Sequence, residues 1–125
     1  MFARSAVDVF AANGITVYIW PRLLPIPTVS FAVCELKAPA GVVIMASHNP
    51  SKYNGYMVYG PDGCQITTEV VKSIFSEIDK IDIYSDVKRI PFGNELACEI
   101  IRYIDDSVLD HYIDAVARYL KEAKL

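Results

Sequence analysis

The chain has 125 residues, of which 53% are hydrophobic and 22% are charged, the balance of one ordinary globular domain. Its formal net charge of −3 argues against a nucleic-acid partner and against binding to an anionic membrane surface. No apolar run approaches the roughly 20 residues of a membrane span, and no signal-peptide pattern is present at the start. The three cysteines are scattered without a CxxC pair, so we expect reduced thiols and a cytosolic location rather than disulfides or a metal knuckle.

The first part of the chain predicts a helix, a strand and a second helix. Apolar residues recur at helical spacing over residues 2–11, and Asn13-Gly14 predicts the end of that helix. Residues 15–20 are rich in β-branched and aromatic side chains, which favour a strand. Thr28 then predicts the cap of a helix that ends before Pro39.

The central run Gly41-Val42-Val43-Ile44-Met45 is continuously apolar and too short for a comfortable helix. Such a run predicts a strand buried on both faces, as in a parallel sheet covered by helices. With the strand at 15–20 and the helix between them, it should form a right-handed parallel crossover. The sequence therefore predicts the α/β class, as a three-layer α/β/α domain with a mostly parallel sheet.

The second half is predicted in less detail. Residues 56–59 favour a third strand, and Thr67 or Thr68 is expected to cap a helix with Glu69 in its first turn. The apolar stripe of that helix comprises Val70, Val71, Ile74, Phe75 and Ile78. Short strands are expected at 81–84 and 99–103. A final helix is predicted with a capping box of Ser107 and Asp110 and an apolar face of Leu109, Tyr112, Ile113, Val116 and Leu120.

The candidate chemistry lies directly after the central strand, in Ala46-Ser47-His48-Asn49-Pro50. In open α/β sheets, ligands bind at the end where a parallel strand emerges. Ser47 is the only candidate nucleophile there, although serine is also a common turn residue. A serine-hydrolase site is disfavoured because no GxSxG elbow surrounds Ser47, and adjacent His48 should point to the opposite face. The residues alone name no reaction.

The loop ASHNP, followed by KYNGY, VYG and DG, resembles the first domain of the α-D-phosphohexomutases, the phosphoglucomutase and phosphomannomutase superfamily. The preceding FAANGITVYIW and PIPTVSFAV also resemble that domain, and the bacterial glucose-type phosphoglucomutases are the most similar in pattern. The resemblance implies an intramolecular phosphotransferase, an isomerase of hexose phosphates. It also implies that the chain, residues 1–125, is a partial N-terminal domain whose first strand and later domains are missing.

The resemblance also implies roles for the loop residues. Ser47 would carry a phosphoryl group, donate it to a sugar monophosphate, and recover the other phosphate from the resulting bisphosphate, glucose 1,6-bisphosphate. His48 would contact the transferring phosphoryl group or the sugar, or else orient the loop; Asn49 and Pro50 would shape the loop. A Mg²⁺ would be held by the phosphate on Ser47 and by aspartates of a second domain, because a phosphoserine needs a cation.

Three positions depart from the family pattern, one of them Cys64, which replaces a small residue. Met45 replaces a threonine beside the phosphoryl site, and Met57 replaces a lysine that could contact phosphate. These changes leave open a non-catalytic remnant or binding module. A mutase acting on pentose or mannose phosphates also stays open, because the resemblance places the sugar-selecting residues on later domains. Met57 has a simpler interpretation as strand packing. We also expect the chain alone to be inactive and, with its first strand missing, to self-associate.

Overall fold

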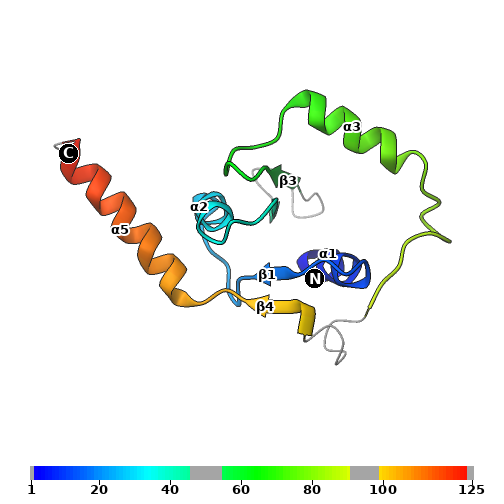
Figure 1. Ribbon diagram of the computed structural model, residues 1–125, viewed down its shortest axis with the longest axis horizontal. Helices are drawn as coiled ribbons and strands as arrows, with labels where there is room; N and C mark the ends of the chain where they lie inside the picture. Colours follow the sequence, from blue (N-terminus) through cyan, green and yellow to red (C-terminus); the bar gives the residue numbers. More distant parts are fainter. Residues whose placement is uncertain (1, 46–54, 91–98, 124–125) are drawn as a thin grey trace. The chain divides into compact units, whose positions relative to one another are not determined.

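The computed structural model describes residues 2–45, 55–90 and 99–123. The chain divides into two compact units, one formed by residues 1–19 with 66–103 and the other by residues 20–65 with 104–125 (Figure 1). Helices and strands are interspersed along the chain, so the predicted α/β class is confirmed. The elements are α1 (Phe2–Ala12), β1 (Val17–Ile19), α2 (Pro27–Glu35), β2 (Gly41–Met45), β3 (Gly55–Tyr59), α3 (Thr68–Ile78), β4 (Ile101–Tyr103) and α5 (Asp106–Glu122).

The first unit contains α1, the strands β1 and β4, and α3. The predicted stop of α1 is confirmed, because Gly14 adopts a left-handed φ of +74°, which glycine reaches without steric cost. Strands β1 and β4 pair in parallel, with Val17 opposite Ile101. The α1 backbone also accepts a hydrogen bond at the Asp8 carbonyl from the Ile90 amide, over 3.2 Å. That bond links Ile90 to α1.

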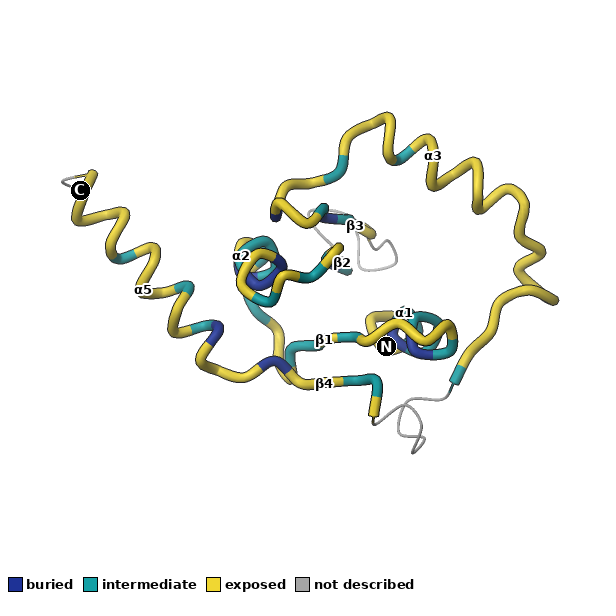
Figure 2. The backbone as a smooth tube through the Cα atoms, in the orientation of Figure 1, coloured by how far each residue is buried: buried dark blue, intermediate teal, exposed yellow. Residues whose placement is uncertain are grey.

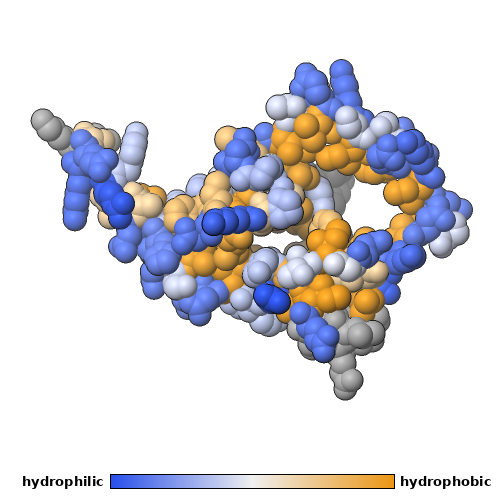
Figure 3. Space-filling model, in the orientation of Figure 1, coloured by the Kyte–Doolittle hydropathy of each residue, from blue (hydrophilic) through white to orange (hydrophobic). Residues whose placement is uncertain are grey.

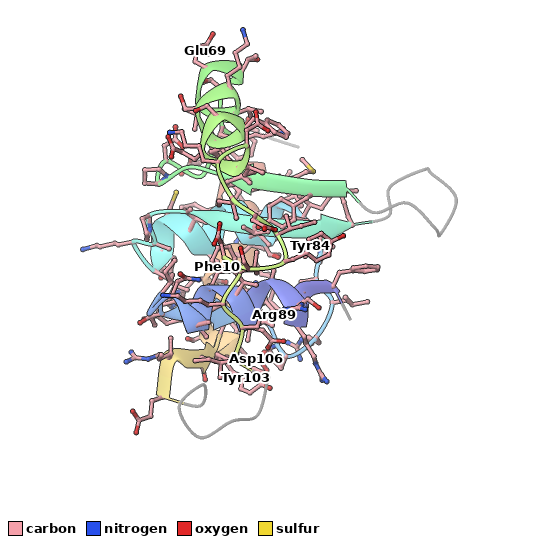
Figure 4. All side chains as sticks on the ribbon, turned by 90° about the vertical axis from the view of Figure 1, so that its right-hand side faces the viewer. Phe10, Glu69, Tyr84, Arg89, Tyr103 and Asp106 are labelled. Carbon is pink, nitrogen blue, oxygen red and sulfur yellow. The ribbon has the colours of Figure 1, made fainter. Side chains whose placement is uncertain are left out.

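Helix α3 has the predicted amphipathic pattern, but none of its residues is buried. Thr67 is at the N-terminal capping position of α3, as predicted. Glu69 lies in the first turn of the helix and is labelled in Figure 4. Hydrogen bonds from its own backbone amide and then from the Thr67 hydroxyl lower the pKa of the Glu69 carboxyl. A negative charge is thereby favoured where the helix dipole is positive.

The expected strand at 81–84 is wrong. The Asp86 amide donates to the Asp82 carbonyl over 2.9 Å, and the Tyr84 amide donates to the Asp82 carboxylate over 2.9 Å. The Asp86 carboxylate in turn accepts from the Asp82 amide. Aspartate side chains here satisfy the backbone locally, which offers an alternative to strand pairing. Of the other expected strand, residues 101–103 are extended as β4.

The second unit contains α2, the β2–β3 hairpin and α5. Ala32 of α2 packs with Ile104 and Val108, where α5 begins, and Trp20, Phe31 and Leu36 surround this cluster. The rings of Phe31 and Tyr112 meet edge to face with their centroids 5.6 Å apart. Figure 2 shows the buried positions of α2 and of the start of α5 in dark blue. The later turns of α5 are mostly exposed, so its predicted apolar face is covered only near the start of the helix.

Two predicted caps are wrong. Helix α2 begins at Pro27, so Thr28 lies inside the first turn, almost fully buried, and its hydroxyl donates to the Pro25 carbonyl over 2.7 Å. Helix α5 is capped by Asp105, whose carboxylate accepts from the Ser107 amide over 2.8 Å, rather than by Ser107. That hydrogen bond lowers the pKa of the Asp105 carboxyl. Proline suits the first helical position, and aspartate is among the best caps, so both outcomes follow ordinary helix chemistry.

Strand pairing also differs from the expected crossover. Among the described strands, β2 pairs antiparallel with β3, whereas β1 pairs with β4 in the other sheet. Antiparallel partners can be joined by a short connection, and closing a short loop costs less conformational entropy than closing a long one. The strand at 41–45 is therefore confirmed with its predicted bounds, but its described partner is the next strand along the chain.

Candidate functional site

The four predicted site residues, Ser47, His48, Asn49 and Pro50, lie outside the described residues. The structure does fix the two points between which they lie. Met45, the last residue of β2, pairs with Gly55, the first residue of β3. The residues on either side of segment 46–54 are therefore paired with each other at the last rung of the hairpin.

The two faces of the β2–β3 hairpin have different surroundings. Gly41 lies opposite Tyr59, and Val43 opposite Met57, so these four residues share one face. Val43 and Tyr59 are only 9% and 8% exposed, and Gly41 lies directly against Val33 of α2. That face is therefore the one that packs on α2.

Met57 thus occupies a packing position. Its cross-strand partner Val43 is buried, and Met57 itself is partly buried on the same face. Methionine fills such a gap without a polar group, whereas a lysine ammonium would need a route back to water. The geometry supports the interpretation of Met57 as strand packing.

Tyr56 lies on the opposite face of the hairpin, next to the rung that closes segment 46–54. It is 55% exposed, and the burial of the remainder raises the pKa of its phenol. A tyrosine phenol is neutral around pH 7, so this hydroxyl can donate a hydrogen bond. Among the described residues, it is the aromatic side chain nearest in the hairpin to the predicted loop.

A turn follows β3 at the end of the hairpin away from segment 46–54. The Gly60 amide donates to the Cys64 carbonyl over 2.8 Å, and the Asp62 carboxylate accepts from the Cys64 amide over 2.9 Å. Gly63 has a φ of +73°, in the left-handed region that suits glycine in a turn. The Ser30 hydroxyl of α2 donates to the Gly63 carbonyl over 2.5 Å.

Sequence reasoning did not identify Ser30, Cys34 or Gly63 as neighbours. A Cβ atom on Gly63 would lie 2.8 Å from the Cys34 sulfur and 2.8 Å from the Ser30 carbonyl oxygen. Ser30, Val33 and Cys34 share one face of α2 because residues three and four apart do so in a helix. That periodicity is the signal that could have grouped them, although it does not name Gly63 as the partner.

No group of three or more potential metal ligands occurs within residues 2–45, 55–90 and 99–123. Cys34 and Cys64 are both free thiols on the surface, as the cysteine pattern predicts. None of the helices that the structure describes combines the length and apolar character needed to cross a membrane.

Comparison with known proteins assigns the fold to a family. Residues 1–85 match the family model of phosphoglucomutase/phosphomannomutase, alpha/beta/alpha domain I. The chain belongs to this family. The match includes the β2–β3 hairpin and the segment between its strands, which confirms the resemblance inferred from the ASHNP loop.

Individual relatives are named as phosphomannomutases, phosphoglucomutases or phosphopentomutases. A probable phosphomannomutase of Haemophilus influenzae is 34% identical over 98% of this chain and 24% of its own length. A phosphoglucomutase of Staphylococcus epidermidis is 44% identical over 64% of this chain and 15% of its own length. The human phosphopentomutase is 44% identical over 63% of this chain and 13% of its own length. The chain therefore matches about a quarter or less of each of these relatives.

Proposed function

We propose that the chain is the part of a phosphosugar mutase that carries the reactive serine. Ser47 would be the carrier that moves a phosphoryl group between the 1- and 6-positions of a hexose phosphate. The observation that supports this most directly is the family match across residues 1–85, which spans the ASHNP segment between β2 and β3. Relatives named for glucose, mannose and pentose phosphates support the class of substrate.

The proposed reaction has two transfers. The sugar hydroxyl attacks the phosphorus on Ser47, the bond between phosphorus and the serine oxygen breaks, and the hydroxyl proton passes through a base to the serine oxygen. The bisphosphate then reorients, the Ser47 hydroxyl attacks its other phosphorus, and the sugar oxygen that is released takes up the serine proton. His48 would hydrogen-bond the transferring group or the sugar, and Asn49 and Pro50 would shape the loop. Such transfers depend mostly on positioning and on neutralising charge.

A Mg²⁺ fits this proposal through the phosphate on Ser47, with aspartates of a further domain as its other ligands. When bound, the ion would offset the nearly two negative charges of the phosphoserine. Glucose 1,6-bisphosphate would serve as intermediate and activator. The further partners would be the remaining domains of the same enzyme, and we place the protein in the cytosol, where free thiols such as Cys34 and Cys64 stay reduced.

A non-catalytic binding module is the second candidate. It is favoured by Met57, which lies on the packed face of the hairpin where a phosphate-contacting lysine would be expected. Met45 adds to this, because it places a thioether rather than a hydroxyl at the start of the loop segment. In this case the family fold would be kept while Ser47 takes up no phosphate.

A chimera distinguishes the two candidates. In the Staphylococcus epidermidis phosphoglucomutase, the segment that matches this chain is replaced by the present sequence. We expect the chimera to convert glucose 1-phosphate to glucose 6-phosphate and to carry a phosphate adduct on Ser47. The Ser47→Ala chimera should lose both, whereas Ser76→Ala, at an exposed serine of α3, should lose neither.

The outcomes decide between mutase and module. A folded chimera with no activity and no adduct would favour the binding module. Activity that survives Ser47→Ala would overturn the proposed role of the serine. The 125-residue chain by itself is expected to show no turnover, because it matches a quarter or less of each relative described above.

A further inference from the structure

At the end away from segment 46–54, the hairpin contacts one short stretch of α2. The contacts are made at the start of β2 and just past the end of β3. At the start of β2, a Cβ atom on Gly41 would lie 2.5 Å from a Val33 methyl carbon and 3.3 Å from a Val29 methyl carbon. Past the end of β3, Gly63 approaches Ser30 and Cys34 just as closely. Glycine at both positions lets the backbone come within contact of the helix.

The contact at Gly63 includes a directional bond. The Ser30 hydroxyl donates to the Gly63 carbonyl over 2.5 Å, in a partly buried position and across 33 residues of sequence. The contacts at Gly41 are apolar and non-directional. Among the contacts that Gly41 and Gly63 make with α2, the bond from Ser30 is therefore the directional one.

The other side of α2 is held by α5. Ala32 packs with Val108, Phe31 meets Tyr112, and the Glu35 carboxylate lies 2.7 Å from the His111 ring nitrogen Nδ1. One side of α2, with residues 31, 32 and 35, therefore contacts α5. The other side, with residues 30, 33 and 34, contacts the hairpin and the turn that follows it. Helix α2 is a fixed base for the hairpin rather than an isolated element.

The position of the first rung of the hairpin, Gly41–Tyr59, determines the position of its last rung, Met45–Gly55. Each strand contributes five residues, paired without a bulge from Gly41–Tyr59 to Met45–Gly55. At about 3.4 Å per residue, the base and the last rung are roughly 14 Å apart. A tilt at the base therefore displaces the rung from which segment 46–54 leaves and to which it returns.

We propose that Ser30 is a positioning residue for the reactive loop. Its hydrogen bond to Gly63 sets the angle of the hairpin on α2 and thereby the place of the last rung, Met45–Gly55, two residues before Ser47 in the sequence. This inference rests on the proposed function, in which Ser47 carries the phosphoryl group. Phosphoryl transfer is sensitive to such placement, because a shift of about 1 Å can reduce a rate up to a hundredfold.

Hydrogen exchange of the 125-residue chain tests the mechanical part. Ser30→Ala leaves the Gly63 carbonyl without its partner, and we expect exchange in peptides covering 41–45 and 55–59 to rise about five- to tenfold. Ser30→Thr keeps the hydroxyl and should restore slow exchange. Ser76→Ala removes an equivalent serine hydroxyl, which donates to the Ser73 carbonyl of α3, and should leave the hairpin unchanged.

Two exchange results would overturn the proposal. One is a rise confined to the turn at 60–65, with the strand peptides unchanged. The other is an equal rise in every helix, including α1, which would mean that Ser30 contributes only to overall stability.

The chimera tests the link to chemistry. There Ser30→Ala should lower kcat up to about a hundredfold with little change in KM, and Ser30→Thr should recover most of the loss. If the chimera is active and Ser30→Ala is equally active, the positioning role is wrong and the proposed function stands. If the chimera is inactive while exchange still depends on Ser30, the proposed function fails, and with it the catalytic purpose of the contact.

Discussion

Gly14 and Gly63 have nearly the same backbone conformation but different surroundings. Their φ angles are +74° and +73°, in the left-handed region that favours glycine. A Cβ on Gly14 would meet no atom within 4 Å, whereas one on Gly63 would lie 2.8 Å from the Ser30 carbonyl oxygen. Substituting each glycine therefore distinguishes two costs to stability: the strain of a left-handed backbone, present at both, and steric contact of the new Cβ atom, present only at Gly63.

Alanine at each glycine should therefore have different effects on stability. Gly14→Ala is expected to lower the free energy of unfolding by about 1–2 kcal/mol, the cost of a left-handed alanine. Gly63→Ala adds overpacking against the α2 backbone and should cost roughly 1–3 kcal/mol more. Urea denaturation of both variants measures the difference. Equal losses would mean that the turn moves away from α2 at little cost.

Asp105 gives a residue-scale prediction on pH. The hydrogen bond from the Ser107 amide lowers the pKa of the Asp105 carboxyl in the folded chain. The stabilisation is therefore fully present above the unfolded value of about 3.9 and is lost as pH falls through the lower folded value. Asp105→Asn keeps a capping side chain but cannot titrate.

Thermal unfolding from pH 7 downward checks this prediction. The Tm difference between the parent chain and Asp105→Asn should be constant above about pH 5 and change only at acid pH. Other carboxylates titrate in both proteins and cancel in the comparison. A difference that varies between pH 6 and 8 would assign the effect to another group.

At the scale of elements, Met57 tests which face of the hairpin carries packing. It lies opposite buried Val43 on the side toward α2. Met57→Lys should lower the free energy of unfolding by about 1–3 kcal/mol, because the ammonium must leave that face or be desolvated. Met57→Leu conserves volume and should cost less than about 1.5 kcal/mol.

Denaturation of both variants decides the matter. If Met57→Lys is as stable as Met57→Leu, position 57 reaches solvent, and a lysine there could contact phosphate. In that case the same substitution should also raise the activity of the chimera. The stability result thus bears on whether Met57 reflects packing or lost chemistry.

Local sequence patterns predicted where helices and strands lie better than which strands pair. The apolar run at 41–45 and the Asn13-Gly14 stop are decided by nearby residues, and both are confirmed. Threonine is a common cap, which favours Thr28, yet Pro27 already begins the helix. The Ser107 and Asp110 spacing fits a capping box, and it does not show that Asp105, two residues earlier, provides the cap.

Local sequence patterns could not predict contacts between residues far apart in the chain. The choice of β3 as partner of β2, and the bond from Ser30 to Gly63 across 33 residues, depend on packing that no short window contains. The family was predictable because the ASHNP loop is a continuous motif, and the match over residues 1–85 confirms it. The roles of Ser47, His48, Asn49 and Pro50 remain predictions, since those residues lie outside the described part.

At the scale of the whole molecule, the first unit presents a large apolar surface. Along one face of α3, four side chains are between 40% and 59% exposed: Val70, Ile74, Phe75 and Ile78. Figure 3 shows hydrophobic side chains gathered along one side of this helix. Ile83 and Tyr84, in the segment that follows, are 65% and 93% exposed. Apolar patches of this kind on soluble proteins favour association with another surface.

We therefore expect the 125-residue chain to self-associate through the α3 face. Sedimentation velocity should show species larger than the monomer that grow with protein concentration. Phe75→Asp places a charge in the middle of the apolar face and should shift the distribution toward monomer. Because Phe75 is 59% exposed, the same change should cost little stability.

The neighbouring Ser76→Asp provides the matched control. It adds the same charge at an exposed position of α3, one residue along, where the side chain bonds only its own helix. Association that persists in Phe75→Asp would place the contact elsewhere, and the exposed edges of β1 and β4 are then the next surface to alter. A parent chain that stays monomeric at every concentration would contradict the expectation, because the exposed apolar area would then be tolerated in water without a partner.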